Sequence, residues 1–215
     1  MKRPNSARAA LALVAMLWAA PAHAAFVTTN EASLDLIYSQ ASFGATPIDI
    51  IFNPVVIVEN YALLTIDGVG DLITLFGLFS AAPTIFAYFV DSVDWCGAFN
   101  VGFAGCGELP GNNFVVESVY AASGNGTELM AHELGHNLGL AHTNPDASNL
   151  MFSEINGNST LTAAQVTALR ASGSVQGTPG AEFVTITPVL ITVAEPTTLG
   201  LLVLGLIAVR RSRRS

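Results

Sequence analysis

Hydrophobic residues follow two different spacings along residues 30–118. In segments 30–41 and 66–79 they recur every three to four positions, as on one face of a helix. Short apolar runs typical of strands occupy three other segments: 47–52, 84–90 and 113–118. Because these strands alternate with helices, the pattern predicts an α/β layered domain.

The domain is expected to span residues 25–172, a length sufficient for a proper core. The stretch 172–180 is rich in small residues and carries Gly and Pro, which is typical of a linker. Residues 182–193 are apolar and suit either a strand or an extended stalk. Pro188 argues against a central strand, because proline lacks the N–H that a ladder needs. Residues 173–194 are therefore predicted to be a linker or stalk.

Residues 1–24 have the layout of a secretory signal peptide. A basic start precedes an apolar run over 9–20, and residues 22–24 form an A-x-A cleavage site. An uncleaved membrane anchor is the alternative, but the apolar run is too short to span a bilayer.

The C-terminal stretch 195–215 has three parts. Glu195 and Pro196 open it, an apolar run over 197–209 follows, and four of the last six residues are arginines. As a helix, the apolar run covers only about 20 Å. A hydrocarbon core is roughly 30 Å thick, so this run alone is a marginal span. The arginines would hold the chain end in the cytoplasm.

This layout resembles the PEP-CTERM sorting signal, with Ala194 where that family usually has a first proline. The resemblance implies an exported protein of a Gram-negative bacterium, at the cell surface or in the extracellular matrix. It also implies transient anchoring by the C-terminus and processing by an exosortase-like enzyme. A plain C-terminal membrane tail is the alternative, with the same outward orientation. Membrane contact is expected through this segment only.

Charge changes the picture of the domain between these ends. The whole chain has a formal net charge of −8. All sixteen acidic residues lie between Glu31 and Glu195, whereas Arg170 is the single base in residues 25–209, giving −15 for that range. Such a domain should repel nucleic acid and anionic lipid and favour cations or basic and neutral substrates. Nucleic-acid binding is excluded on this ground.

Three of the four histidines of the chain lie in one segment, HELGHNLGLAH, residues 132–142. Segment 126–138 is free of proline and rich in helix formers, with Thr127 as a candidate N-cap. His132 and His136 are four positions apart, so a helix places them on one face, where both rings can approach a zinc ion.

Two further residues extend this pair. Gly139 can adopt the positive φ that ends a helix and reverses the chain, which would bring His142 back to the same ion. Glu133 follows His132 on the helix and would lie beside the metal, free to handle a water molecule. Three imidazoles leave one position of a tetrahedral zinc open, as in catalytic sites. Surface histidines without metal, and a structural metal site without catalysis, are the alternatives.

The full pattern H-E-x-x-H-x-x-G-x-x-H resembles the metzincin metalloproteases. That resemblance covers about residues 47–172 and implies a zincin-like fold. Its expected parts are a twisted mixed sheet with an antiparallel edge strand over the cleft, an active-site helix and a C-terminal helix. Met151 would occupy a methionine turn beneath the metal. Segment 160–172 would be the closing helix, with Thr162 and Gln165 forming a capping box.

The resemblance implies an exported zinc-dependent endopeptidase. Glu133 would act as general base on a zinc-bound water, and the three histidines would be the ligands of one catalytic Zn²⁺. A protein or peptide substrate would lie along the edge strand, which family analogy places near 113–118. No histidine remains for a second zinc, and nothing indicates Ca²⁺, although the acidic surface leaves such a site open.

Two alternatives from other classes remain. The first is a non-catalytic surface or extracellular-matrix protein in which zinc only staples the fold. The second is a zinc-dependent hydrolase of a non-peptide substrate.

Cys96 and Cys106 are the only cysteines. An exported domain meets oxidising conditions, so this even pair at short spacing favours a disulfide. The bridge is expected to steady the substrate-binding edge strand. Two free buried thiols are the alternative.

Overall fold

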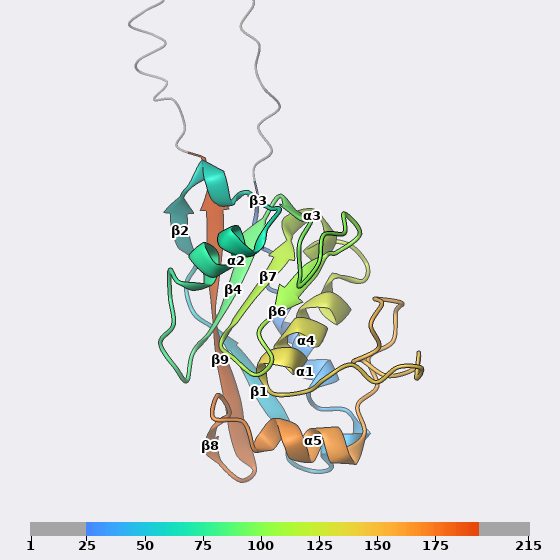
Figure 1. The fold of residues 1–215 in the computed structure, drawn as a ribbon. Coiled ribbons are helices and arrows are strands. Elements are labelled where there is room, and N and C mark those ends of the chain that lie inside the picture. The colour runs from blue at the N-terminus through green and yellow to red at the C-terminus, as the bar shows by residue number, and fades with distance from the viewer. Residues whose placement is uncertain (1–24, 194–215) are drawn as a thin grey trace, which may run out of the picture.

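The computed structural model describes residues 25–193 (Figure 1). The expected signal peptide at 1–24 and the sorting segment at 195–215 lie outside this range. Within it, no helix is long and apolar enough to cross a membrane.

A seven-stranded sheet forms the centre of the fold, with strand order β1-β9-β4-β7-β6, and with β2 and β8 also paired to β9. All pairs are parallel except β6 with β7 and β8 with β9. The strands are β1 (Ile48–Phe52), β2 (Val56–Glu59), β4 (Ile85–Val90), β6 (Gly105–Gly107), β7 (Asn113–Glu117), β8 (Gln176–Thr178) and β9 (Ala181–Thr192). Strands β3 (Thr65–Ile66) and β5 (Ser92–Val93) form a separate pair.

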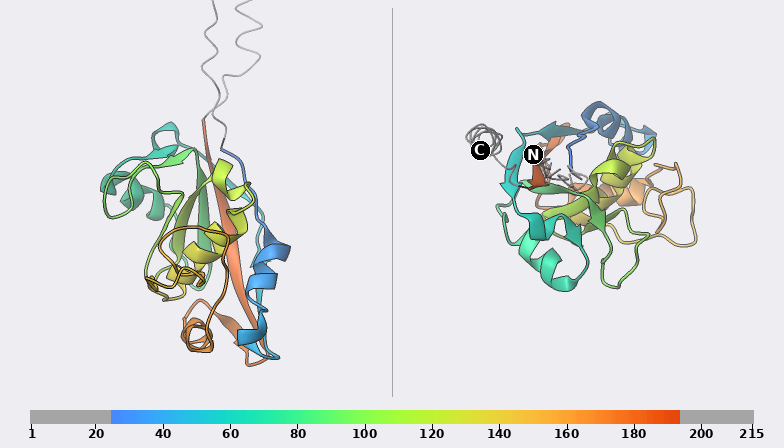
Figure 2. Two further views of the ribbon diagram at one scale, coloured as in Figure 1. Left: turned by 90° about the vertical axis from the view of Figure 1, so that its right-hand side faces the viewer. Right: turned by 90° about the horizontal axis from the view of Figure 1, so that it is seen from above.

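Helices cover both faces of this sheet. The α-helices are α1 (Glu31–Ile37), α2 (Val69–Phe76), α3 (Ser118–Ala121), α4 (Gly126–Asn137) and α5 (Ala163–Arg170); η1 (Ala41–Phe43) and η2 (Tyr61–Leu63) are short 3-10 turns. Helices α1 and α2 lie on opposite sides of the sheet (Figure 2). The architecture is therefore a mixed α/β fold with a mostly parallel sheet.

The alternation of side chains along β4 shows how the sheet serves two cores. Ile85, Ala87 and Phe89 pack in the core that α1, α4 and α5 cover. Phe86, Tyr88 and Val90, from the same strand, pack in the second core, on the side of α2. Because both faces are buried, β4 is apolar throughout, as expected for a central strand of a parallel sheet.

The predicted elements are present, with differences at their ends. The three strands expected from the apolar runs are β1, β4 and β7, and the four expected helices are α1, α2, α4 and α5. The Thr162–Gln165 capping box of α5 is confirmed. Asn30 makes no side-chain cap on α1. Helix α4 already begins at Gly126, so Thr127 is not its N-cap.

The prediction of a linker or stalk over 173–194 is wrong. Residues 176–178 and 181–192 form β8 and β9, and β9 pairs with four other strands: β1, β2, β4 and β8. The register explains why Pro188 is tolerated. The backbone carbonyl of Ile186 accepts a hydrogen bond from the N–H of Asn53, so the backbone polar groups of Ile186 face β1. Backbone groups two residues apart in a strand face the same neighbour, so the nitrogen of Pro188 also faces this side of β9. At Pro188 the pairing of β9 with β1 has ended and its pairing with β2 has not begun, so the N–H that proline lacks would have had no carbonyl partner there.

The expected place of the edge strand is also wrong. Residues 113–117 form β7, which is paired on both sides, and the antiparallel strand at this edge of the sheet is β6. Strand β6 has only three residues, two of them glycine, and therefore lacks the apolar run by which a strand is recognised.

The Cys96–Cys106 disulfide is confirmed, with Cα atoms 5.6 Å apart. Cys106 is the middle residue of β6 itself, so the bridge ties the edge strand directly to the loop before it.

Arg170, the single base among residues 25–193, lies at the end of α5. Its guanidinium donates to the backbone carbonyls of Phe43 and Thr46, and its Nε lies 3.5 Å from a carboxylate oxygen of Glu182. The Arg170 guanidinium therefore connects α5 to η1, to the residues that follow η1 and to β9.

Truncation tests the central position of β9. We expect a chain of residues 25–172 to be unfolded, because β9 contributes four fully buried side chains: Val184, Ile186, Val189 and Ile191. Each contributes roughly 1.5–3 kcal/mol on burial, and the total stability of a domain is only about 5–15 kcal/mol. A chain of residues 25–193 is the control and should melt cooperatively by circular dichroism. A cooperative melt of the shorter chain would contradict this role of β9.

Removing the disulfide tests its contribution to stability. Cys96→Ser with Cys106→Ser should lower the free energy of unfolding by about 3 kcal/mol, because the open loop gains entropy in the unfolded chain. Denaturant unfolding measures the change. The same experiment on the wild-type protein under reducing conditions should give an equal loss, and no loss in either case would show that the bridge does not stabilise the fold.

Candidate metal centre

Helix α4 carries the first two histidines along one buried face. All of its residues except Thr127 are buried, and Leu129, Met130, Ala131 and Leu134 lie in the core beneath the sheet. The helix starts where Gly126 approaches α3 closely: a β-carbon there would lie 1.8 Å from the carbonyl oxygen of Ala121. Only glycine fits this junction, which sets the direction of α4 under the sheet.

Two backbone carbonyls fix the rings of these histidines. Nδ1 of His132 lies 2.7 Å from the carbonyl oxygen of Leu150, and Nδ1 of His136 lies 2.7 Å from that of Leu140. A carbonyl oxygen only accepts, so each Nδ1 carries the proton and each Nε2 presents a lone pair. This is the tautomer that binds a metal ion through Nε2.

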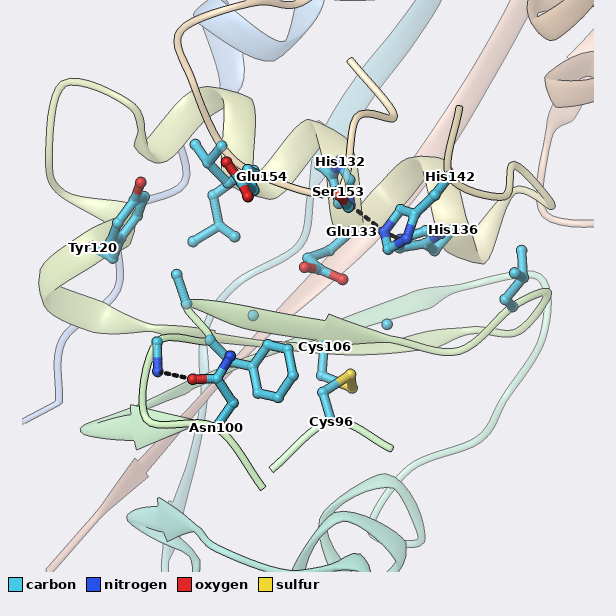
Figure 3. Close-up of a pocket in the computed structure, with 18 of the residues that line it drawn as sticks. Cys96, Asn100, Cys106, Tyr120, His132, Glu133, His136, His142, Ser153 and Glu154 are labelled. Atoms are coloured by element: carbon cyan, nitrogen blue, oxygen red, sulfur yellow. Dashed lines mark hydrogen bonds between the residues drawn. A yellow bond between two sulfur atoms is a disulfide. The ribbon is translucent and has the colours of Figure 1, made fainter. Parts of the chain in front are cut away.

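His142 completes the cluster from the loop after the helix. Gly139 ends the turn with a φ of 97° and lets the chain reverse, as expected from the sequence. Nε2 of His142 lies 3.3 Å from Nε2 of His132 and 3.1 Å from Nε2 of His136. Figure 3 shows the three rings directed toward one point.

This geometry fits a metal ion. Ligands about 2.0–2.1 Å from a tetrahedral zinc lie about 3.3 Å from one another, close to the Nε2 separations here. The ligand atoms of all three histidines lie within 4.8 Å of one another. Burial lowers the pKa of each ring, that of His132 to about 4, so the rings are neutral near pH 7. Three histidines can therefore hold a metal ion.

Glu133 lies between the histidines and β6 (Figure 3). A β-carbon on Gly105 would lie 2.7 Å from Oε1 of Glu133, and one on Gly107 would lie 3.0 Å from Oε2. The two glycines thus make room for the carboxyl group. Oε2 has no hydrogen-bond partner among the described residues. Burial raises the pKa of Glu133 to about 8.

Met151 is fully buried beside the helix. A β-carbon on Gly135 would lie 2.6 Å from its sulfur, so Gly135 allows the close contact. The backbone N–H of Met151 donates to Oδ1 of Asn149, and its carbonyl accepts from Thr143, the neighbour of His142. The turn at Met151 therefore supports both the Leu150 carbonyl and the loop of His142.

A cavity of about 810 Å³ opens over these groups. It is lined by the three histidines, by Glu133, by strand β6 with its disulfide, and by residues of the loops on either side. All the site residues expected from the sequence thus lie together: the histidines and Glu133 line the cavity, Met151 lies behind the helix, and the disulfide borders the cavity.

Several residues of this site escaped prediction. Gly105 and Gly107 alternate around Cys106, and such spacing in a strand places both on one face, a signal that could have identified them. Tyr120 and Glu154 also line the cavity. Glu154 lies in the loop after Met151, which the resemblance to metzincins implies shapes the specificity pocket, but no motif marks either residue itself.

No protein-family model and no curated protein matches this chain. The chain is an α/β domain with a cluster of three histidines that can hold a metal ion, beside a buried glutamate.

Proposed function

We propose that the protein is a zinc-dependent endopeptidase in which Glu133 is the general base. The observation that carries this proposal is the convergence of three Nε2 atoms beside a buried carboxyl group that has a free oxygen and faces an open cavity. The resemblance of the motif to metzincins supports the same reaction, with Met151 in the methionine turn.

His132, His136 and His142 would hold the ion, and the position facing the cavity would stay open. A bound zinc ion supplies a Lewis acid that polarises a carbonyl group and lowers the pKa of water. In its ionised form the Glu133 carboxyl group, which lines the cavity, would accept a proton from the attacking water and pass it to the leaving nitrogen. The glycines of β6 would hold that carboxyl group in position.

Strand β6 is a suitable platform for an extended peptide. It lies at one edge of the sheet, paired only with β7 among the described strands, and it lines the cavity next to Glu133. An added peptide strand would bind through backbone hydrogen bonds that do not depend on its sequence. This favours a peptide over other hydrolysable substrates.

A zinc ion that only staples the fold is the main alternative. Such a site has four protein ligands as a rule and no need of a general base. Here three histidines converge, and the Glu133 carboxyl group lies buried without a partner for Oε2. Because burying an unsatisfied carboxyl group costs stability, a purely structural site would not be expected to retain it.

The place of action is part of the proposal. The signal layout of 1–24 and the PEP-CTERM-like segment 195–215 support export to the cell surface or extracellular matrix, with C-terminal anchoring and exosortase-like processing. The Cys96–Cys106 disulfide supports this location, because disulfides form and persist in oxidising compartments outside the cytoplasm.

Glu133→Gln tests the general base. The amide has nearly the same volume but cannot accept the proton, so casein cleavage should fall by about 10²–10⁴-fold, or roughly 3–5 kcal/mol of barrier. Zinc content should be unchanged, because the three histidines are intact. Glu59→Gln, an exposed site on β2, is the matched control. Full activity in Glu133→Gln would contradict the role of Glu133, and chelator-insensitive cleavage by the wild type would contradict the role of the metal.

Acidification should release the metal at lower pH than for ordinary histidines. The rings bind only when neutral, and their lowered pKa values keep them neutral as the pH falls through about 6. Zinc measured after dialysis should be equal at about pH 7.5 and 6 and largely lost near pH 4. His142→Ala should lower the zinc affinity at every pH. Full zinc retention in His142→Ala would remove His142 from the ligand set.

A further inference from the structure

One part of the cavity next to Glu133 has an apolar wall. Ala104, Tyr120, Leu129 and Ile155 line it, and all four belong to the main hydrophobic core or pack against it. A long substrate side chain could therefore lie on the outer margin of the core while its peptide backbone follows β6.

Glu154 is the exposed acidic residue of this cavity. It follows the turn at Met151 and precedes Ile155, a residue of the apolar wall. Figure 3 shows it on the same side of the histidines as Tyr120. Its carboxylate makes no hydrogen bond or ion pair with the described residues, so it is free to meet a charge on a ligand.

No positive side chain of residues 25–193 competes for Glu154. Among the residues that line the cavity there is no lysine or arginine. Arg170 is engaged with Phe43, Thr46 and Glu182 at the end of α5. A cationic group of a ligand that enters the cavity can therefore pair with the Glu154 carboxylate without competition from an arginine or lysine of residues 25–193.

We propose that Glu154 selects substrates with a lysine or arginine side chain at the position that occupies this part of the cavity. The proposal rests on the endopeptidase function above. The aliphatic stem of the basic side chain would pack on Tyr120, Leu129 and Ile155, and its charged end would pair with the Glu154 carboxylate. Lys and Arg side chains commonly bind in this divided manner, with the stem on apolar surface and the charge in water.

The size of the effect follows from the exposure of Glu154. Exposed ion pairs are worth about 0.2–1 kcal/mol, which corresponds to a preference of roughly 1.4- to 5-fold. Salt screens such a pair, so the preference should weaken as ionic strength rises.

Paired peptides provide the test. Lysine is placed at successive positions on either side of the scissile bond of one peptide series, and norleucine replaces it in a matched series with the same stem and no charge. Mass spectrometry locates each cleavage, and kcat/KM is measured for every pair. The decisive quantity is the Lys/norleucine ratio of the wild type divided by that of Glu154→Gln, which cancels the intrinsic difference between the two side chains.

We expect this quotient to be roughly 1.4- to 5-fold at one position and to be one at the others. Glu154→Lys should shift the preference further, toward a glutamate at that position. Glu59→Gln removes the same charge outside the cavity and should leave the ratio at its wild-type value. A quotient of one at every position, or an equal change in Glu59→Gln, would overturn the proposal.

A binding measurement separates this proposal from the function on which it rests. Zinc-loaded Glu133→Gln protein is titrated calorimetrically with the same peptide pairs, with and without Glu154→Gln. Loss of the lysine preference on removing Glu154 supports the proposal even where the wild type cleaves no peptide, a result that would overturn the endopeptidase function alone. Equal affinity for both series, with Glu154 present or absent, would overturn the selectivity of Glu154.

Discussion

A histidine can offer a metal either of its ring nitrogens, and in this protein two backbone carbonyls make the choice. The carbonyls of Leu150 and Leu140 each hold an Nδ1–H at 2.7 Å, which leaves Nε2 of His132 and His136 as the free acceptors. Both carbonyls belong to segments outside helix α4. The geometry of the metal centre therefore depends on how two turns are held against the helix, as much as on the spacing of histidines along it.

The support of those turns reaches into the core. Met151 is buried against Gly135, a position with no side chain between the two helical histidines. The same turn accepts a bond from Thr143, next to His142. A disturbance of the core at Met151 would thus be transmitted to all three rings. On the other side of the helix, Gly105 and Gly107 bring β6 against Glu133, so the edge strand holds the Glu133 carboxyl group and the turns hold the histidine rings.

Arg170 and the acidic side chains that line the cavity lie in different parts of the described fold. Arg170, the one arginine or lysine among residues 25–193, joins α5 to the rest of the fold, whereas the cavity is lined by two glutamates and the three histidines and by no arginine or lysine. A cluster of neutral imidazoles in an acidic surrounding attracts cations of every kind. The lone pairs that converge within the cluster explain why a metal ion would be preferred there over a basic side chain.

The sequence predicted most elements and the metal cluster because both depend on local patterns. Helical spacing, apolar runs and the capping box of Thr162 and Gln165 are properties of adjacent residues, and so is the interval between His132, His136 and His142. The errors concern pairing between distant segments. Nothing near Pro188 shows that the neighbouring ladder is broken at that position, and nothing in Gly105–Gly107 shows that it will pair with β7.

The position of β9 has a consequence for how the chain folds. The strand that lies between β1 and β4 in the sheet, β9, is the last of the sheet to be synthesised, so β1 and β4 are not joined until residues 181–192 are present. Contacts of such high sequence separation make folding slow, because the entropy of closing a long loop is lost before the strand pairs contribute favourable free energy. The part of the sheet that contains β1 and β2 therefore joins the part that contains β4, β7 and β6 only after nearly the whole domain has been synthesised.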